Sequence, residues 1–192
     1  MMNNLPNLLT WLRILSIPLI IGVFYCPDGW LDDQQRNILA TSLFIAAAVT
    51  DWLDGYLARR LSQTSAFGAF LDPVADKLMV AAALILLVEV ERLGAIVAII
   101  IIGREIAISA LREWMASLGK GKSVAVSMVG KVKTAFQMVA IPMLLYHDSL
   151  GPFQMAVIGY WLIHIAAALT LISMFYYLKL AAPFTGGDGK NP

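Results

Sequence analysis

The chain of 192 residues is 59% hydrophobic and only 14% charged, with a mean hydropathy of +0.75. This composition argues against an ordinary soluble domain, in which about one residue in four is charged. A net charge of +1 gives no general attraction to nucleic acid, and the single cysteine, Cys26, excludes an internal disulfide. The sequence therefore predicts a membrane protein with no nucleic-acid partner.

Six apolar runs follow one another along the chain and predict six membrane helices. The first and last runs are long enough to cross a bilayer. Each of the middle four has only about 11 to 14 uncharged residues, whereas a crossing needs roughly 20. Each middle helix must therefore include charged neighbours in its span. The runs lie near residues 8–25, 37–50, 78–90, 93–103, 135–146 and 152–178.

The charged residues that flank the four middle runs fall at one membrane face, because successive helices alternate in direction. Charged side chains at membrane depth are costly, and they usually line a water-filled cavity or pair with one another. We therefore expect one polar cavity at this face and treat it as the candidate functional site. The flanking residues are Asp51, Asp54, Asp72, Asp76, Arg104, Arg112, Lys131 and Lys133.

The lysines and arginines predict the orientation of the bundle. Twelve of the 14 lie at the face that holds the cavity and both termini, whereas only Arg36 and Arg92 lie at the other face. The positive-inside rule places the cavity and the termini in the cytoplasm. We expect an all-α, multi-pass bundle of six transmembrane helices in a bacterial inner membrane. Residues 1–185 would form one domain and residues 186–192 a flexible tail.

The four aspartates of this group lie at helical spacing in two pairs. Asp51 and Asp54 are three residues apart, and Asp72 and Asp76 are four apart, so each pair shares one helix face. The short connection between the pairs predicts two antiparallel neighbouring helices whose carboxylates face each other. Four such carboxylates repel and need cations to stay ionised. Oxygen ligands without Cys or His favour Mg²⁺ or Mn²⁺, and two such ions about 3.5 to 4 Å apart can clamp a diphosphate.

Small residues share the faces of these aspartates. Gly55 and Ala58 follow the first pair, and Gly68 precedes the second, which leaves room for a bulky nucleotide. Pro73 allows two interpretations: Asp72 caps a helix that begins there, or Pro73 kinks a helix that begins near Ser65. We prefer the kinked helix, because it keeps Gly68 on the face of the second aspartate pair. The alternative, that the aspartates are only helix caps and surface charges, does not explain the matched small residues.

This segment resembles the signature of the CDP-alcohol phosphatidyltransferases, DxxDGxxAR, eight residues, then GxxxDxxxD. Every fixed position is present, as Asp51, Asp54, Gly55, Ala58, Arg59, Gly68, Asp72 and Asp76. The resemblance implies that an alcohol displaces CMP from a CDP-linked lipid such as CDP-diacylglycerol. It also implies two bound Mg²⁺ or Mn²⁺ ions and a homodimer embedded among membrane lipids.

The resemblance also implies residue roles. The four aspartates would be metal ligands, and Asp76 would also be the base that deprotonates the acceptor hydroxyl. The nucleotide and diphosphate would be bound by Asp54, Gly55, Ala58, Arg59 and Gly68.

The basic residues at the same face point to an anionic acceptor. Arg104 and Arg112 are eight residues apart, about two turns on one helix face, and Lys131 and Lys133 begin the next helix. A phosphate on the acceptor would suit these four residues, because Arg forms bidentate contacts and Lys supplies a compact charge. Under the alternative interpretation they are ordinary positive-inside charges, with Glu105 and Glu113 as local partners.

Three shorter segments are similar to the branch of the family that uses glycerol 3-phosphate. They are Gly103 to Glu105, Gly130 to Thr134 with Gln137, and Asn4 to Thr10 with Arg13. The last of these would form a short amphipathic segment on the inner surface, before the bundle. Inositol phosphate, serine and phosphatidylglycerol stay open as other acceptors.

Two further classes of function compete with transfer. A divalent-cation transporter also needs carboxylates on membrane helices, but its pathway should continue through the apolar outer halves. The other class is a noncatalytic CDP-lipid binding protein. Among the remaining polar residues we expect Tyr177 to anchor the chain at the interface, and His164 to bond to a neighbouring helix.

Overall fold

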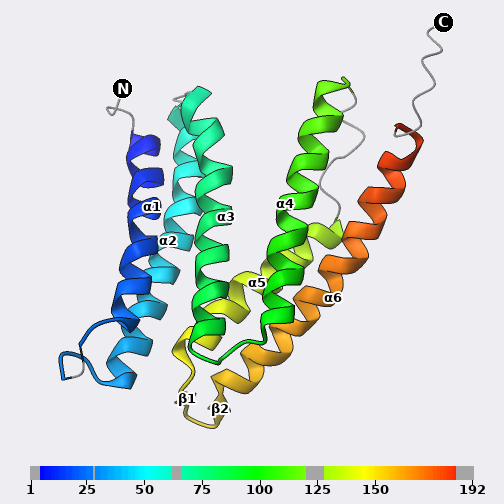
Figure 1. The fold of residues 1–192 in the computed structure, drawn as a ribbon. Coiled ribbons are helices and arrows are strands. Elements are labelled where there is room, and N and C mark those ends of the chain that lie inside the picture. The colour runs from blue at the N-terminus through cyan, green and yellow to red at the C-terminus, as the bar shows by residue number, and fades with distance from the viewer. Residues whose placement is uncertain (1–4, 28, 62–65, 120–127, 185–192) are drawn as a thin grey trace, which may run out of the picture.

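The computed structural model describes residues 5–27, 29–61, 66–119 and 128–184, and within them it is almost entirely helical (Figure 1). The predicted all-α fold with six long helices is confirmed. The elements are α1 (Leu5–Phe24), α2 (Asp33–Leu61), α3 (Ala66–Glu89), α4 (Ala95–Ser117), α5 (Met128–Tyr146), the hairpin β1 (Ser149–Leu150) and β2 (Phe153–Gln154), α6 (Met155–Ala181), and a 3-10 turn at Ala182–Phe184.

The helices include the charged segments beside the apolar runs. α2 continues to Leu61 through the first aspartates, and α3 begins at Ala66, well before the second pair. The six helices have 19 to 29 residues, which corresponds to about 28 to 44 Å at the usual helical rise. Within the described ranges, only α6 is both long enough and apolar enough to cross a membrane by composition.

The starts of α3 and α1 decide two expectations. α3 begins ahead of Pro73 and continues through it, as the kinked-helix interpretation requires, so Gly68 and Asp72 share one helix. α1 is a single helix from Leu5 to Phe24. A separate amphipathic segment before the bundle is therefore wrong for the residues from Leu5 onward. The polar residues of that stretch have a different place, because Thr10 and Arg13 are buried inside the bundle.

α1 connects the two helices that carry the aspartates. It packs extensively on both α2 and α3, whereas α2 and α3 share few direct contacts in the part of the chain that is described. Among the described residues α1 therefore supplies most of the contacts to both helices, and the expected direct pairing of α2 with α3 stays a prediction, because most of the end of α2 next to that connection lies outside the described side chains. On the other side α4 and α5 both pack on α6, and α5 crosses the molecule to reach α2 (Figure 1).

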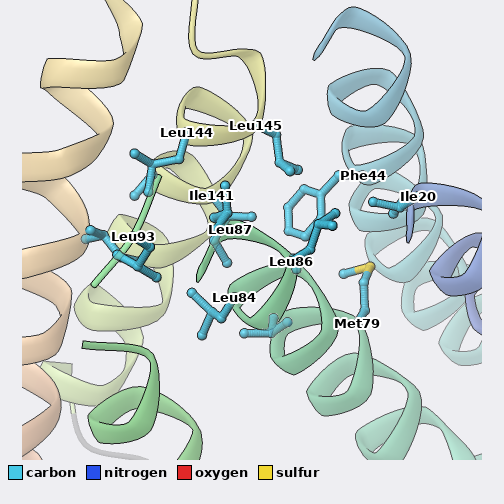
Figure 2. Close-up of a cluster of buried hydrophobic side chains, with 14 of the residues drawn as sticks. Ile20, Phe44, Met79, Leu84, Leu86, Leu87, Leu93, Ile141, Leu144 and Leu145 are labelled. Carbon is cyan, nitrogen blue, oxygen red and sulfur yellow. The ribbon is translucent and has the colours of Figure 1, made fainter. Parts of the chain in front are cut away.

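The hydrophobic core lies in the half of the bundle away from the aspartates. Phe44, Met79, Leu87 and Ile141 are almost completely buried there and come from three different helices (Figure 2). Burying side chains of this size supplies most of the stabilisation of a fold. The core residues follow Asp76 on α3 and precede Asp51 on α2, so the polar end of each helix stays outside the core.

Arg92, in the turn between α3 and α4, holds the apolar end together. Its guanidinium donates to the carbonyl oxygen of Leu145 at 2.7 Å and to Oδ1 of Asn37 at 2.7 Å. The same group lies 5.4 Å from the centre of the Phe24 ring, within the range of a cation–π contact. Asn37 in turn donates to Asp148 at 3.1 Å. One arginine thus joins the ends of α1, α2 and α5.

The contact between α5 and α6 depends on a missing side chain at Gly159. A Cβ atom built there would lie 3.0 Å from both Leu144 Cγ and Met143 Cβ, and 3.2 Å from the carbonyl oxygen of Ala140. These distances are shorter than ordinary van der Waals contact, and one of the atoms belongs to the backbone. The two helices therefore pack this closely only because residue 159 is glycine.

We expect Gly159→Ala to lower the free energy of unfolding by about 1 to 3 kcal/mol, because the added methyl forces α5 and α6 apart. Gly22→Ala is the matched control, since a Cβ atom at Gly22 meets no atom within 4 Å. The control should be neutral or slightly stabilising because alanine favours a helix. Unfolding in detergent solution measures both, and equal stability of the two variants would contradict the prediction.

Candidate active site

α1 contacts two of the four signature aspartates. Arg13 Nη1 lies 2.7 Å from Asp51 Oδ1 on α2, and Thr10 Oγ1 donates to Asp72 Oδ1 on α3 at 2.5 Å. Thr10 and Arg13 are three residues apart and therefore share one face of α1, where both are 1% exposed. The Asp51 side chain is 42% exposed. α1 thus orients one carboxylate from each aspartate pair.

Asp76 lies among charges from several helices. Its carboxyl interacts electrostatically with Asp51 and Arg13, with the adjacent Lys77, and with Lys133 of α5. The structure therefore brings Asp51 and Asp76 into the same electrostatic environment, although they come from different helices. The interaction with Lys133 also connects the aspartates to the basic residues predicted to bind the acceptor.

The rest of the signature is described only in part. Gly68 is buried on α3, but the side chains of Asp54, Gly55, Ala58 and Arg59 lie outside the described residues. Among the side chains that are described, no three of the types His, Cys, Asp and Glu come together to hold a metal ion. Because Asp54 is not in that set, the four-aspartate metal site stays a prediction. The donors are all carboxylate oxygens, which suit a hard divalent cation.

A second polar cluster joins α4, α5 and α6. Lys133 and Arg104 are 3% and 7% exposed, and both contact the same oxygen, Oε1 of Glu105. The distance from Arg104 Nη1 to that oxygen is 3.2 Å. Arg104 Nη2 also donates to the hydroxyl of Ser173 at 2.8 Å, and its guanidinium lies 5.7 Å from the centre of the Tyr177 ring. Two buried cations therefore share one carboxylate.

The four basic residues predicted for the acceptor divide into two groups. Arg104 and Lys133 meet in the buried cluster, whereas Arg112 and Lys131 are exposed on α4 and α5. Arg112 still interacts electrostatically with Arg104. The described structure thus brings two of the four cations together in a protected position and leaves two where solvent reaches them.

Several polar atoms near the cluster have no hydrogen-bond partner among the described residues. They are Arg104 Nε, Gln137 Oε1 and Thr170 Oγ1, and all three are buried. Gln137 lies one helical turn from Lys133, and Thr170 lies one turn from Ser173, so they fall on the same helix faces as the cluster. Buried polar groups without partners are rare in proteins, and they are often completed by water or a ligand.

The sequence indicates Glu105 only as a local partner of the basic residues, under the alternative interpretation, and it indicates no role for Ser173 or for Tyr177 beside Arg104. Tyr177 is 3% exposed and its ring faces the guanidinium of Arg104, so the expectation that it is an interfacial anchor is wrong. The spacing of Ser173 and Tyr177, four residues apart in an otherwise apolar helix, was the available signal. His164 also differs from expectation: its Nδ1 lies 2.7 Å from the carbonyl oxygen of Tyr160 in its own helix.

A small cavity opens beside the cluster, between α3 and α4. Its volume is about 110 Å³, and its polar lining comes from Lys77 and Glu105. The other lining residues are aliphatic, among them Leu78 and Ile101. Glu105 therefore faces both the buried cations and an open space.

Comparison with known proteins identifies extended similarity along the whole chain. Residues 3–172 match the CDP-alcohol phosphatidyltransferase family. A Pseudomonas fluorescens protein named CDP-diacylglycerol–glycerol-3-phosphate 3-phosphatidyltransferase is 50% identical over 193 residues, covering 98% of this chain and 95% of its own. Relatives with the same name from Shigella flexneri serotype 5b and Pectobacterium atrosepticum are 49% and 50% identical, each covering 94% of this chain and 96% of its own.

The hydrogen bond from Thr10 to Asp72 should couple α1 to α3. We expect Thr10→Val and Asp72→Ala, in a double-mutant cycle without added metal, to show a coupling free energy of about 1 to 2 kcal/mol. Thermal unfolding in detergent measures it.

Thr50→Val is the control for this cycle, because the Thr50 hydroxyl bonds only to the carbonyl oxygen of Ala46 in its own helix among the described contacts. It should show no coupling to Asp72→Ala. A coupling near zero for Thr10 as well would mean that the bond does not hold the helices together.

Proposed function

The chain belongs to the CDP-alcohol phosphatidyltransferase family, and on this basis we propose that it transfers the phosphatidyl group from CDP-diacylglycerol to glycerol 3-phosphate. The products would be phosphatidylglycerol phosphate and CMP. The observation that carries the proposal is about 50% identity, over nearly the whole chain, to relatives whose names state this donor and this acceptor. The complete aspartate signature supports the same reaction.

In the proposed reaction the acceptor hydroxyl attacks the phosphorus that carries diacylglycerol. A new oxygen–phosphorus bond forms, the bond from that phosphorus to the oxygen of CMP breaks, and Asp76 accepts the hydroxyl proton. Asp76 suits this role because its carboxyl interacts electrostatically with Asp51 and also with Lys133, which belong to the two halves of the proposed site.

We assign the binding of metal to Asp51, Asp54, Asp72 and Asp76. Bound Mg²⁺ or Mn²⁺ ions, two in number, would neutralise the diphosphate and stabilise the negative charge on the departing CMP. The accessible side chain of Asp51 and the all-carboxylate donor set support this assignment. Arg13 and Thr10 orient Asp51 and Asp72 through the contacts described above.

We assign the nucleotide and the acceptor to opposite sides of Asp76. Asp54, Gly55, Ala58, Arg59 and Gly68 would bind the CDP group, as the family signature implies. Arg104 and Lys133 would bind the acceptor phosphate, with Arg112 and Lys131 attracting it from solvent. The burial of Arg104 and Lys133 and the unpartnered Nε atom of Arg104 support this division.

We further propose that all six helices cross a bacterial inner membrane, with the site and both termini in the cytoplasm. The helix lengths and the large excess of Lys and Arg at the aspartate end support this placement. The acyl chains of the donor would then stay in lipid while the nucleotide stays in water. A homodimer is proposed from family membership alone.

The purified protein, incubated with CDP-diacylglycerol and Mg²⁺, should release CMP when glycerol 3-phosphate is added. Inositol phosphate, serine and phosphatidylglycerol, tested separately, should release little, because they do not match the acceptor of the relatives. Chromatography of CMP measures the reaction. Metal flux into liposomes without CMP release would instead favour the transporter.

Asp76→Asn should reduce CMP release by about a hundredfold or more, because an amide cannot accept the proton from the acceptor. Asp33→Asn is the control, since the side chain of Asp33 is 97% exposed at the opposite end of the bundle. Both variants should keep the helical circular dichroism of the parent protein. Full activity of Asp76→Asn would remove this residue from the role of base.

A further inference from the structure

Glu105 occupies the position between the two buried cations that the proposed function assigns to the acceptor phosphate. A single carboxylate oxygen contacts Arg104 and Lys133 at once. Both cations are almost fully buried, so without an anion their desolvation would be costly. A resident carboxylate therefore explains how this end of the bundle remains stable when no acceptor is bound.

The charges in this cluster do not balance. Within the ion-pair contact itself, Arg104 and Lys133 contribute two positive charges and Glu105 one negative charge, which leaves an excess of one; Asp76 adds a negative charge that acts on Lys133 from outside this contact. A phosphate monoester carries a charge of about −1.5 to −2 near neutral pH, so it matches the two cations better than one carboxylate does. If the phosphate and Glu105 contacted both cations together, the negative charges would exceed the positive ones and repel each other.

Glu105 has space to leave the cations. Its side chain is 26% exposed, unlike those of its two partners, and it lines the cavity between α3 and α4. Lys77 lines the same cavity and offers another positive charge there. Arg104 would stay in place without Glu105, because the Ser173 hydroxyl and the Tyr177 ring also hold its guanidinium.

We propose that Glu105 is an exchangeable counter-ion that competes with the acceptor phosphate for Arg104 and Lys133. It pairs with the cations in the empty site, yields them to the phosphate of the acceptor, and pairs with them again as the phosphorylated product leaves. This inference rests on the proposed function, because the group exchanged is the phosphate of that acceptor. An uncharged alcohol cannot displace the carboxylate, so the exchange also selects phosphorylated acceptors.

The test compares Glu105→Gln with the parent protein in the CMP-release assay. Glutamine keeps the length of the side chain but removes the competing charge. The KM for glycerol 3-phosphate should therefore fall, by roughly five- to tenfold. Inorganic phosphate should inhibit the variant at a correspondingly lower concentration, and it should raise the midpoint of thermal unfolding more than in the parent. Glu113→Gln is the matched control, because Glu113 is exposed on the same helix, and it should leave all three quantities unchanged.

A KM that is unchanged or raised in a folded Glu105→Gln variant overturns the exchange. Where that variant does not fold, Glu105→Asp provides the test. Its shorter side chain holds the two cations less well, so the KM for glycerol 3-phosphate should still fall. A KM at or above the parent value overturns the proposal. A parent protein that releases no CMP with glycerol 3-phosphate refutes the proposed function, and the exchange with it. A parent that uses this acceptor with an unaltered KM in the variants refutes the exchange alone.

Discussion

An ionised side chain inside an apolar bundle is stable only beside an opposite charge or a hydrogen-bond partner, and the polar end of this molecule follows from that constraint. Arg13 pairs with Asp51, Thr10 bonds to Asp72, and Lys133 and Arg104 share Glu105. All of these contacts except the one between Arg104 and Glu105, which lies within α4, join one helix to another. The pairs therefore fix the relative positions of the helices and also arrange the groups that the proposed reaction needs.

One end of the bundle holds most of the hydrophobic core, and the other end holds the candidate active site. At the apolar end, large side chains such as Phe44 and Leu87 are fully buried, and Arg92 joins the helix ends through backbone carbonyls and Asn37. At the polar end only a smaller apolar cluster around Ile108, Met115 and Tyr177 is described, and ion pairs and buried atoms without partners, such as Gln137 Oε1, accompany it. Functional sites often occupy such less satisfied regions, because the missing partners are supplied by the substrate.

Much of this arrangement could be predicted from local patterns in the sequence. The six apolar runs identified six helices, and the charged flanks indicated that α2 would extend past Asp51. The position of Gly68 favoured, of two interpretations, a start of α3 before Pro73. The aspartate signature, a matter of spacing along two helices, identified the family. These features depend on periodicity and composition, which a single sequence displays directly.

Contacts between distant segments could not be predicted in the same way. Thr10 is 62 residues from Asp72, and Lys133 is 28 residues from Glu105, so no helical spacing indicates either pair. The short connection between α2 and α3 predicted direct packing, but it gave no indication that α1 packs on both helices, as it does among the described residues. Tyr177 near a helix end fits an interfacial residue equally well until the position of Arg104 is known.

The close approach of α5 and α6 at Gly159 has a consequence for the distant polar end. Ser173 lies fourteen residues farther along α6 than Gly159, which is about 21 Å of helix. A change of about 5° in the crossing angle at Gly159 would therefore displace Ser173 by about 2 Å relative to Lys133 on α5. The geometry of the basic cluster is thus set partly by the absence of a side chain at Gly159, at the other end of α6. Related proteins with a larger residue where α5 and α6 cross should differ in how well their basic cluster fits the same acceptor.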